Sequence, residues 1–278
     1  IQARVLRNHC TANIYGIHTY TGWSSSSPSG SQNMICENIC CENTNSGIYM
    51  GYSSSTIVSG NLCNNNGYHG IYDSGGSNLI FSNNLCLSNG SAGIQLYGKN
   101  GAVSTVVVEG NICYTSSEAG HAMYLDIAQY CKIIGNRCYS KNGYALKMYK
   151  TQYSAIIGNY CTSPMTCIEV SGDYNAINGN VCSGGTGIYL SDDGSVADLN
   201  TVSGNTVVNF TTGIHLAEKT SMNTISGNTC IRSSYTEDQY SILLDLNSEK
   251  NLISGNLLGK NYTDNSGIAT NTFVNNKV

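Results

Sequence analysis

Four side chains near the middle of the chain could carry out acid–base chemistry together: Asp126, the neighbours Lys147 and Tyr149, and Glu169. A lysine among carboxylates can neutralise an anionic substrate or act as a base, while Tyr149 or Tyr124 can donate a proton. If equivalent positions stack, Asp126 and Glu169 lie two repeats apart, a separation that approaches the one used by inverting glycosidases. A surface Lys147–Glu169 ion pair worth about 0–1 kcal/mol would explain the same residues without catalysis.

These residues belong to a repeat of about 24 residues that runs through the whole chain. Its marker is a Gly-Asn pair with a Cys two positions after the Asn, as in Gly60-Asn61-Leu62-Cys63. The Asn series is Asn8, Asn38, Asn61, Asn84, Asn111, Asn136, Asn159, Asn180, Asn205, Asn228, Asn256 and Asn276. Two positions further stand Cys10, Cys40, Cys63, Cys86, Cys113, Cys138, Cys161, Cys182, Val207, Cys230, Leu258 and Val278.

Each repeat also carries a short segment of the pattern G-I-x-L, as in Gly47-Ile48-Tyr49-Met50 and Gly187-Ile188-Tyr189-Leu190. Apolar and polar residues alternate there, which is typical of a strand, and helical spacing persists nowhere for three turns. Two or three short strands per repeat predict an all-β solenoid, a coil of parallel strands with about twelve rungs and very little helix. We expect a single domain over 1–278, cut from a longer chain, with a loop insertion at 19–32.

The pattern G-I-x-L…N-x-I-x-G-N-x-C resembles the right-handed parallel β-helix repeat of the pectin-lyase-like superfamily. That superfamily includes polysaccharide lyases, glycoside hydrolases, uronate epimerases, NosD-like surface proteins and phage tailspikes. The resemblance covers the chain from Val5 to Val278. It implies the fold far more specifically than the function, and no catalytic signature of one of these families matches residue by residue.

Tyrosines concentrate at the outward positions of the G-I-x-L strand. A tyrosine ring offers a flat apolar face and a hydroxyl, a combination with which proteins hold sugar rings. The predicted sugar-binding residues are Trp23, in the 19–32 insertion, and Tyr49, Tyr72, Tyr97, Tyr124 and Tyr189. Two other interpretations remain: stacked tyrosines also stabilise strands by cross-strand packing, and Trp23 also fits a disordered loop tip.

The Asn and Cys series are interpreted as structural. Stacked Asn side chains can hydrogen-bond along the axis of the coil. Stacked thiols about 4.8 Å apart exceed the separation that a disulfide requires, so the nine ladder cysteines are predicted to be free and buried. One pair among Cys36, Cys41, Cys131 and Cys167 could still be bridged. His69 and His121, just before their strands, are predicted to be exposed loop residues.

Composition excludes several classes of function. A net charge of −4 and a charged fraction of 11% give no electrostatic basis for binding nucleic acid. No apolar run is long enough for membrane insertion. We expect no cofactor and no metal, since zinc, calcium and nucleotide motifs are missing and Asp192-Asp193 fits a solvated turn.

Three functions remain open. The first is an extracellular or virion-associated β-helix that binds a polysaccharide along the tyrosine-rich face. If it is an enzyme, it cleaves or epimerises that polysaccharide. The second is a carbohydrate-binding or adhesive surface protein without catalysis, and the third is a structural rod or filament. Expected partners are a polysaccharide and the neighbours in a homotrimer or filament, and the expected location is extracellular, on a cell surface or on a virion.

Overall fold

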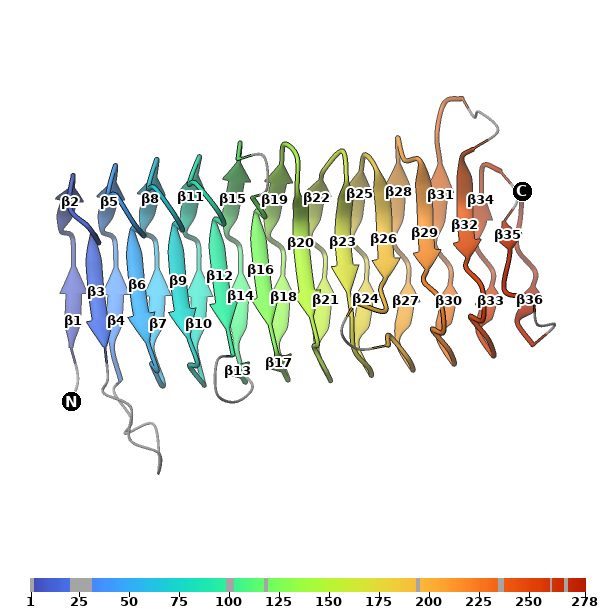
Figure 1. Cartoon of the computed structure of the whole chain (residues 1–278), viewed down its shortest axis with the longest axis horizontal. Coiled ribbons are helices and arrows are strands. Elements are labelled where there is room, and N and C mark those ends of the chain that lie inside the picture. Colours follow the sequence, from blue (N-terminus) through green and yellow to red (C-terminus); the bar gives the residue numbers. More distant parts are fainter. Residues whose placement is uncertain are drawn as a thin grey trace.

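The computed structural model describes residues 3–20, 32–98, 103–117, 120–193, 196–234, 238–260, 262–267 and 270–278. Within these ranges the chain forms a rod of stacked turns made of short strands, with no helix (Figure 1). Trp23 and most of the predicted 19–32 insertion lie outside the described residues. Thr19 and Tyr20, expected to begin that insertion, instead complete strand β3 (Ile17–Tyr20).

Three parallel sheets run the length of the rod. Sheet A consists of β1 (Arg4–Leu6), β4 (Met34–Cys36), β7 (Ile57–Ser59), β10 (Ile80–Ser82), β14 (Val107–Glu109), β18 (Lys132–Ile134), β21 (Ala155–Ile157), β24 (Ala176–Asn178), β27 (Thr201–Ser203), β30 (Thr224–Ser226), β33 (Leu252–Ser254) and β36 (Thr272–Val274). Sheet B consists of β2 (His9–Thr11), β5 (Ile39–Cys41), β8 (Leu62–Asn64), β11 (Leu85–Leu87), β15 (Ile112–Thr115), β19 (Arg137–Ser140), β22 (Tyr160–Thr162), β25 (Val181–Ser183), β28 (Thr206–Val208), β31 (Thr229–Ile231) and β34 (Leu257–Leu258).

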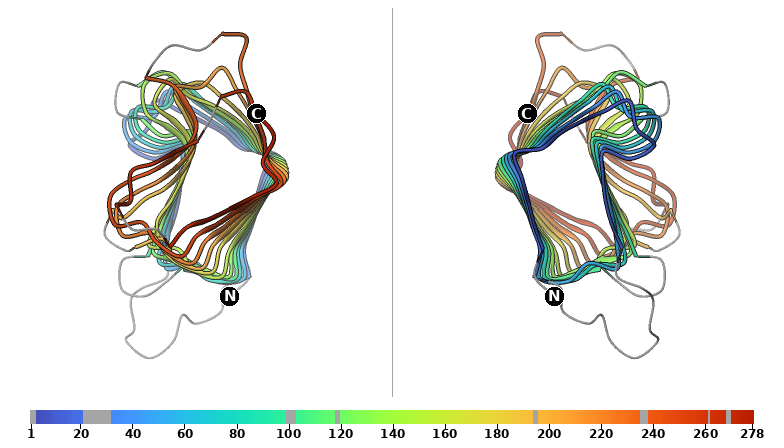
Figure 2. Two further views of the ribbon diagram at one scale, coloured as in Figure 1. Left: turned by 90° about the vertical axis from the view of Figure 1, so that its right-hand side faces the viewer. Right: turned by 90° about the vertical axis from the view of Figure 1, so that its left-hand side faces the viewer.

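Sheet C consists of β3, β6 (Ile48–Gly51), β9 (Ile71–Ser74), β12 (Ile94–Tyr97), β16 (Met123–Asp126), β20 (Tyr144–Tyr149), β23 (Thr166–Val170), β26 (Thr186–Leu190), β29 (Thr212–Leu216), β32 (Tyr240–Leu244) and β35 (Thr263–Asp264). A small additional pair joins β13 (Val103–Ser104) and β17 (Ala128–Gln129). The sheets hold twelve, eleven and eleven strands, which confirms the predicted solenoid of about twelve rungs. Viewed along the rod, successive turns superimpose around a common interior (Figure 2).

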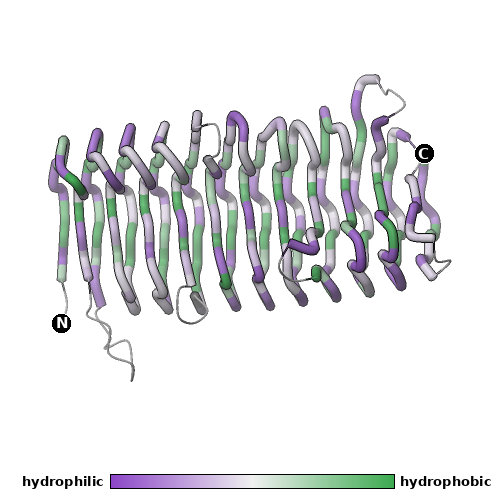
Figure 3. Tube along the Cα trace, in the orientation of Figure 1, coloured by the Kyte–Doolittle hydropathy of each residue, from purple (hydrophilic) through white to green (hydrophobic). Residues whose placement is uncertain are grey.

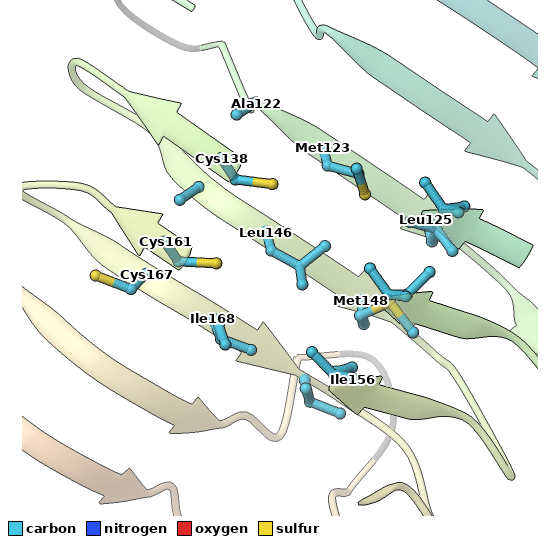
Figure 4. Close-up of a cluster of buried hydrophobic side chains, with 14 of the residues drawn as sticks. Ala122, Met123, Leu125, Cys138, Leu146, Met148, Ile156, Cys161, Cys167 and Ile168 are labelled. Atoms are coloured by element: carbon cyan, nitrogen blue, oxygen red, sulfur yellow. The ribbon is translucent and has the colours of Figure 1, made fainter. Parts of the chain in front are cut away.

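The interior is filled by inward residues that recur on every turn, so hydrophobic segments line up along the rod (Figure 3). In the middle of the rod, Cys138 and Cys161 point toward the same interior space as Leu146 and Ile168 (Figure 4). Fully burying one such aliphatic side chain contributes about 1.5–3 kcal/mol, so the stacked columns supply most of the stabilisation.

The cysteine ladder is confirmed. Neighbouring members such as Cys63 and Cys86 are direct register partners, and the ladder cysteines are buried except for Cys10, which is half-buried. All thirteen cysteines are free, including the four that lie off the ladder. The ladder also explains the Gly of G-I-x-L: a Cβ on Gly70 would lie 2.6 Å from the Gly93 carbonyl oxygen and 3.1 Å from Cys86 Cβ.

The asparagine ladder at the corner between sheets A and B is unbroken. Each Asn Nδ2 donates to Oδ1 of the next Asn at 2.8–3.0 Å, from Asn8 to Asn276. Two shorter series at the other corners did not stand out in the sequence. They are Asn13, Asn43, Asn66 and Asn89, and Asn175, Asn200, Asn223, Asn251 and Asn271.

An acidic residue, Asp73, interrupts the apolar pattern of the interior. Asp73 is fully buried and faces the interior between Met50 and Leu96. Its Oδ2 accepts a 2.7 Å hydrogen bond from the Gly76 N–H, but Oδ1 has no hydrogen-bond partner. Burial raises the pKa of Asp73 to about 7, because desolvation penalises the charged form.

Candidate functional site

The outer face of sheet C carries the predicted site residues in two adjacent columns. The register places His18, Tyr49, Tyr72, Gln95, Tyr124, Lys147, Glu169, Tyr189, His215 and Leu243 in the first column. The second column contains Tyr20, Gly51, Ser74, Tyr97, Asp126 and Tyr149. At the far end Leu243 pairs with Thr263.

Lys147 is the centre of a charged cluster on this face. Its Nζ lies 3.2 Å from Glu169 Oε1 and 3.2 Å from Asp193 Oδ2. The Lys147 side chain is 12% exposed and that of Glu169 is 2% exposed, so the pair is not the solvated surface pair of the simpler interpretation. Nζ also lies 4.6 Å from the centroid of the Tyr144 ring and 5.8 Å from that of Tyr149.

The charge of Lys147 is held by its partners. Burial by itself lowers the pKa of Lys147, but attraction and hydrogen bonding to the Glu169 carboxylate outweigh it, so the pKa is raised above its usual value. The ammonium group is therefore charged at neutral pH. This state favours neutralisation of an anion by Lys147 over a role as a base.

Two carboxylates of the cluster have oxygen atoms without partners. Asp126 is 7% exposed, and its Oδ1 is buried with no hydrogen bond; Glu169 Oε2 is in the same situation. Burial raises the pKa of Asp126, against the opposing attraction of Lys150 and Lys147. The two acids lie two rungs apart, as predicted, because Asp126 pairs with Tyr149 while Lys147 pairs with Glu169.

A third outward column, three residues before the first, supplies site residues that the sequence analysis missed. It contains Tyr15, His69, His121 and Tyr144. The signal was present in the repeat, since each stands three positions before a first-column residue. His121 is half-buried, with its ring centroid 5.3 Å from that of Tyr124 and 5.1 Å from that of Tyr144.

The prediction that His69 and His121 are exposed was wrong. His69 is 2% exposed, and its Nδ1 accepts the Ala92 N–H at 3.3 Å. His121 Nδ1 accepts the Tyr144 N–H at 3.4 Å. Burial lowers the pKa of both imidazoles to about 4, so both rings are neutral at pH 7. The hydrogen bond from a backbone N–H to Nδ1 fixes the orientation of each ring.

An aromatic pocket of about 270 Å³ lies three rungs before Lys147 on the same face. It is lined by Tyr15, Asn45, Ser46, Tyr49, Tyr68, His69, Tyr72, Gln95 and Tyr97. Three of the predicted sugar-binding tyrosines, Tyr49, Tyr72 and Tyr97, therefore come together in one hollow. Burial raises the pKa of Tyr72 to about 12, so its hydroxyl is protonated and can donate.

Stacking limits which ring faces a ligand can reach. Tyr49 and Tyr72 have centroids 5.2 Å apart, and the His69 ring lies nearly parallel to that of Tyr72 at 5.1 Å. Rings on neighbouring rungs cover one another's faces along the rod axis, so only the ring edges point to the solvent. A free face arises only where an aliphatic or amide side chain interrupts the column, as Gln95 does beside Tyr72.

A second acid–base pair lies beyond Glu169. His215 Nε2 is 2.8 Å from Asp245 Oδ2, and the His215 ring stacks on Tyr189 at 4.7 Å. Both side chains are partly exposed. Tyr189, the last predicted sugar-binding residue, thus lies between the charged cluster and this pair.

Comparison with known proteins supports the fold. A family described as periplasmic copper-binding protein (NosD) matches residues 2–106. The alginate lyase of Paenibacillus sp. str. FPU-7 has a TM-score of 0.53 at 11% identity, over 99% of this chain and 92% of that one. Tailspike protein 3 of bacteriophage CBA120 scores 0.54 at 14% identity, over 98% of this chain and 51% of the tailspike.

The A-module of a mannuronan C-5 epimerase from Azotobacter vinelandii scores 0.50 at 12% identity, over 89% of this chain and 86% of the module. No curated protein matches the chain. The chain therefore has the right-handed parallel β-helix fold of pectin-lyase-like proteins. It spans only about half the length of the tailspike. Among the described residues there is no helix that could cross a membrane.

Proposed function

We propose that the protein binds an acidic polysaccharide along the outer face of sheet C and processes it at the Lys147 cluster. The observation that carries this proposal is Lys147, a mostly buried cation 3.2 Å from Glu169 Oε1, on a face where Glu169 Oε2 and Asp126 Oδ1 are buried without hydrogen-bond partners. Unpartnered polar atoms cost stability, which a bound ligand can offset by supplying the missing hydrogen bonds.

The roles follow from the protonation states. Lys147 stays charged and neutralises a sugar carboxylate. Tyr124 keeps its proton at neutral pH, because burial and then the Asp126 charge raise its pKa well above the usual value, and it is the proposed donor. Asp126 is the second carboxylate of the site, with Tyr149 beside it on the next rung. Glu169 Oε2 is the proton acceptor. The aromatic pocket with Tyr49, Tyr72 and Tyr97, and Tyr189 on the other side, bind the neighbouring sugars.

The related folds agree with this choice of polymer. Two of the similar structures are named for alginate and mannuronan, and a third is a phage tailspike. We accordingly propose an extracellular, cell-surface or virion location, with a homotrimer or filament as the assembly. Trp23, outside the described residues, remains a proposed sugar contact.

Copper does not fit the described residues, although the family matching residues 2–106 is described as copper-binding. In the described ranges no three His, Cys, Asp or Glu side chains gather to hold a metal ion. His9 and His18 share a turn, as do Cys161 and Cys167, but no third ligand joins either pair in the described ranges. We derive no step through a metal.

A non-catalytic structural or adhesive rod is the second candidate. It is favoured by an exposed ridge at the corner between sheets C and A, where Tyr130, Tyr153 and Tyr174 stack with centroids 5.2 and 4.9 Å apart. Leu199 and Met222 continue the ridge and are also exposed. Large apolar side chains along a rod are suited to lateral contacts between copies.

A panel of galacturonate, mannuronate, guluronate and neutral oligosaccharides tests the first candidate against the second. Binding is measured by calorimetry, elimination by ultraviolet absorbance, hydrolysis by new reducing ends and epimerisation by NMR. Binding of an acidic glycan that Lys147→Gln abolishes supports the proposal. Filaments in negative stain, with no glycan bound, would favour the structural rod.

A further inference from the structure

One turn of the rod carries an unusual concentration of positive charge. Between Asp126 and Glu169 the chain has no acidic residue but includes the basic residues Lys132, Arg137, Lys141, Lys147 and Lys150. Lys132 lies on sheet A, Arg137 on sheet B and Lys147 on sheet C, so the charge surrounds the rod. Because the whole chain has a net charge of −4, the rest of the rod is more negative than the total indicates.

On sheet B this turn passes through a groove of about 450 Å³. Two columns of outward side chains form its walls. Between them lie Cys113 and Cys138, whose side chains point into the rod. One wall consists of Ile112, Arg137 and Tyr160, and the other of Leu87, Tyr114, Tyr139 and Thr162. The groove therefore runs along the rod axis across four rungs.

Arg137 is the charged group of this groove, and its charge is not compensated. The guanidinium carbon lies 5.6 Å from the centroid of the Tyr160 ring. Arg137 makes no ion pair within the part of the chain that the structure describes. No outward position of the sheet B strands carries Asp or Glu.

The remaining polar groups of the groove are hydroxyls. Tyr114 and Tyr139 stack with centroids 4.9 Å apart and planes 5° apart, so their edges face outward. Together with Tyr160 and Thr162 they offer groups that both donate and accept hydrogen bonds, as sugar hydroxyls do. Ile112 and Leu87 supply apolar surface for the C–H face of a ring.

We propose that this groove is a second glycan-binding site, which takes a short oligosaccharide bearing a carboxylate. Arg137 forms two parallel hydrogen bonds with the carboxylate, while the tyrosine edges and aliphatic side chains contact the rings. The groove volume lies within the range of small-molecule sites, about 300–1,000 Å³. The site lies on a different sheet from the Lys147 cluster and does not require catalysis there.

The test is an NMR titration of the Lys147→Gln protein, in which the sheet C cluster has lost its cation. Trigalacturonate, trimannuronate and triguluronate are the probes. We expect amide shifts in Ile112–Tyr114 and Arg137–Tyr139, and a Kd about tenfold or more higher once Arg137→Gln is added. Arg137→Lys should fall between, because it keeps the charge without the bidentate geometry.

Three controls make the result decisive. Lys132→Gln removes an exposed cation of the same turn on sheet A and should change Kd less than about twofold. Galactotriose, which is neutral, and triglutamate, which matches the charge, should bind at least about tenfold more weakly than the best uronate. Arg137 is exposed, so its variants should keep the urea midpoint of the parent protein.

The proposal is overturned if no probe shifts the sheet B amides at millimolar concentration, or if Arg137→Gln leaves Kd unchanged. Equal affinity for galactotriose or triglutamate would likewise overturn it. Uronate shifts confined to sheet C in the wild-type protein would support the proposed function while rejecting this second site, so the two failures are distinguishable.

Discussion

Lys147 Nζ lies 3.2 Å from Asp193 Oδ2, although 46 residues separate the two in the chain. The contact spans two rungs, because Lys147 stacks on Glu169, Glu169 stacks on Tyr189, and Asp193 lies in the turn that follows the strand of Tyr189. One ammonium group thus joins a buried acid and an exposed acid. Its removal should affect both the stability of the rod and the chemistry of its outer face.

Glu169→Gln should lower the free energy of unfolding by about 2–3 kcal/mol, since it leaves a mostly buried ammonium with only Asp193 as partner. Urea unfolding measures this loss. The matched control is Glu37→Gln, which breaks the solvated Arg7–Glu37 pair between adjacent rungs and should leave the free energy of unfolding nearly unchanged. Equal losses would mean that Lys147 is as well solvated as Arg7.

Lys147→Gln should weaken uronate binding on sheet C about tenfold or more, because a desolvated cation attracts a carboxylate strongly. Calorimetry in the wild-type and Arg137→Gln backgrounds separates this effect from that of the sheet B groove. Lys132→Gln, on sheet A, serves as the control and should leave the affinity within about twofold. If Lys147→Gln and Lys132→Gln behave alike, the Lys147 cluster is not the binding site.

Asp73→Asn should stabilise the protein at pH 7.5 and much less at pH 4.5. The folded-state pKa of Asp73 is raised to about 7, above the usual 3.8, so the folded state binds the extra proton. Its contribution is fully present below pH 4 and is lost as the pH rises to about 7, by at most about 4 kcal/mol. Urea unfolding of both proteins at the two pH values gives the difference. A gain that does not depend on pH would show that Asp73 does not titrate between them.

Asn136→Ala should cost about 3 kcal/mol, since it removes the hydrogen bonds to Asn111, Asn159 and the Val108 carbonyl and leaves buried groups unpaired. The exposed Asn142→Ala, six residues away, should change stability by less than about 0.5 kcal/mol. Chemical denaturation of the two variants side by side makes the comparison. A small loss at Asn136 would indicate that water replaces the amide in the ladder.

The buried cysteines should resist iodoacetamide in the native protein and react after denaturation without reductant. Burial raises the pKa of Cys131 to about 11 and that of Cys230 to about 12, so neither forms the reactive thiolate at neutral pH. Cys10, Cys36 and Cys41, which are half-buried, should react first. Peptide mapping by mass spectrometry follows each site. A disulfide between Cys63 and Cys86 would contradict the stacked geometry.

The repeat in the sequence determined the solenoid, its register and its ladders. A period of about 24 residues with alternating apolar positions has few ways to bury its apolar side chains other than stacking. Once Cys63 and Cys86 occupy equivalent positions, so do Tyr49 and Tyr72, and the columns of sheet C follow without further information. The rung relationships of Asp126, Lys147, Tyr149 and Glu169 were therefore predictable.

Only the tertiary structure decided what these side chains experience. The burial of each outward side chain depends on the long side chains of neighbouring rungs. It also depends on turns such as the one that carries Asp193, and these turns do not follow the repeat. For that reason His69 and His121 were predicted to be exposed, Glu169 was open to interpretation as a solvated residue, and the groove beside Arg137 was not predicted. Repeats specify position along and around the rod, whereas solvation and charge arise from contacts between turns, where each rung differs.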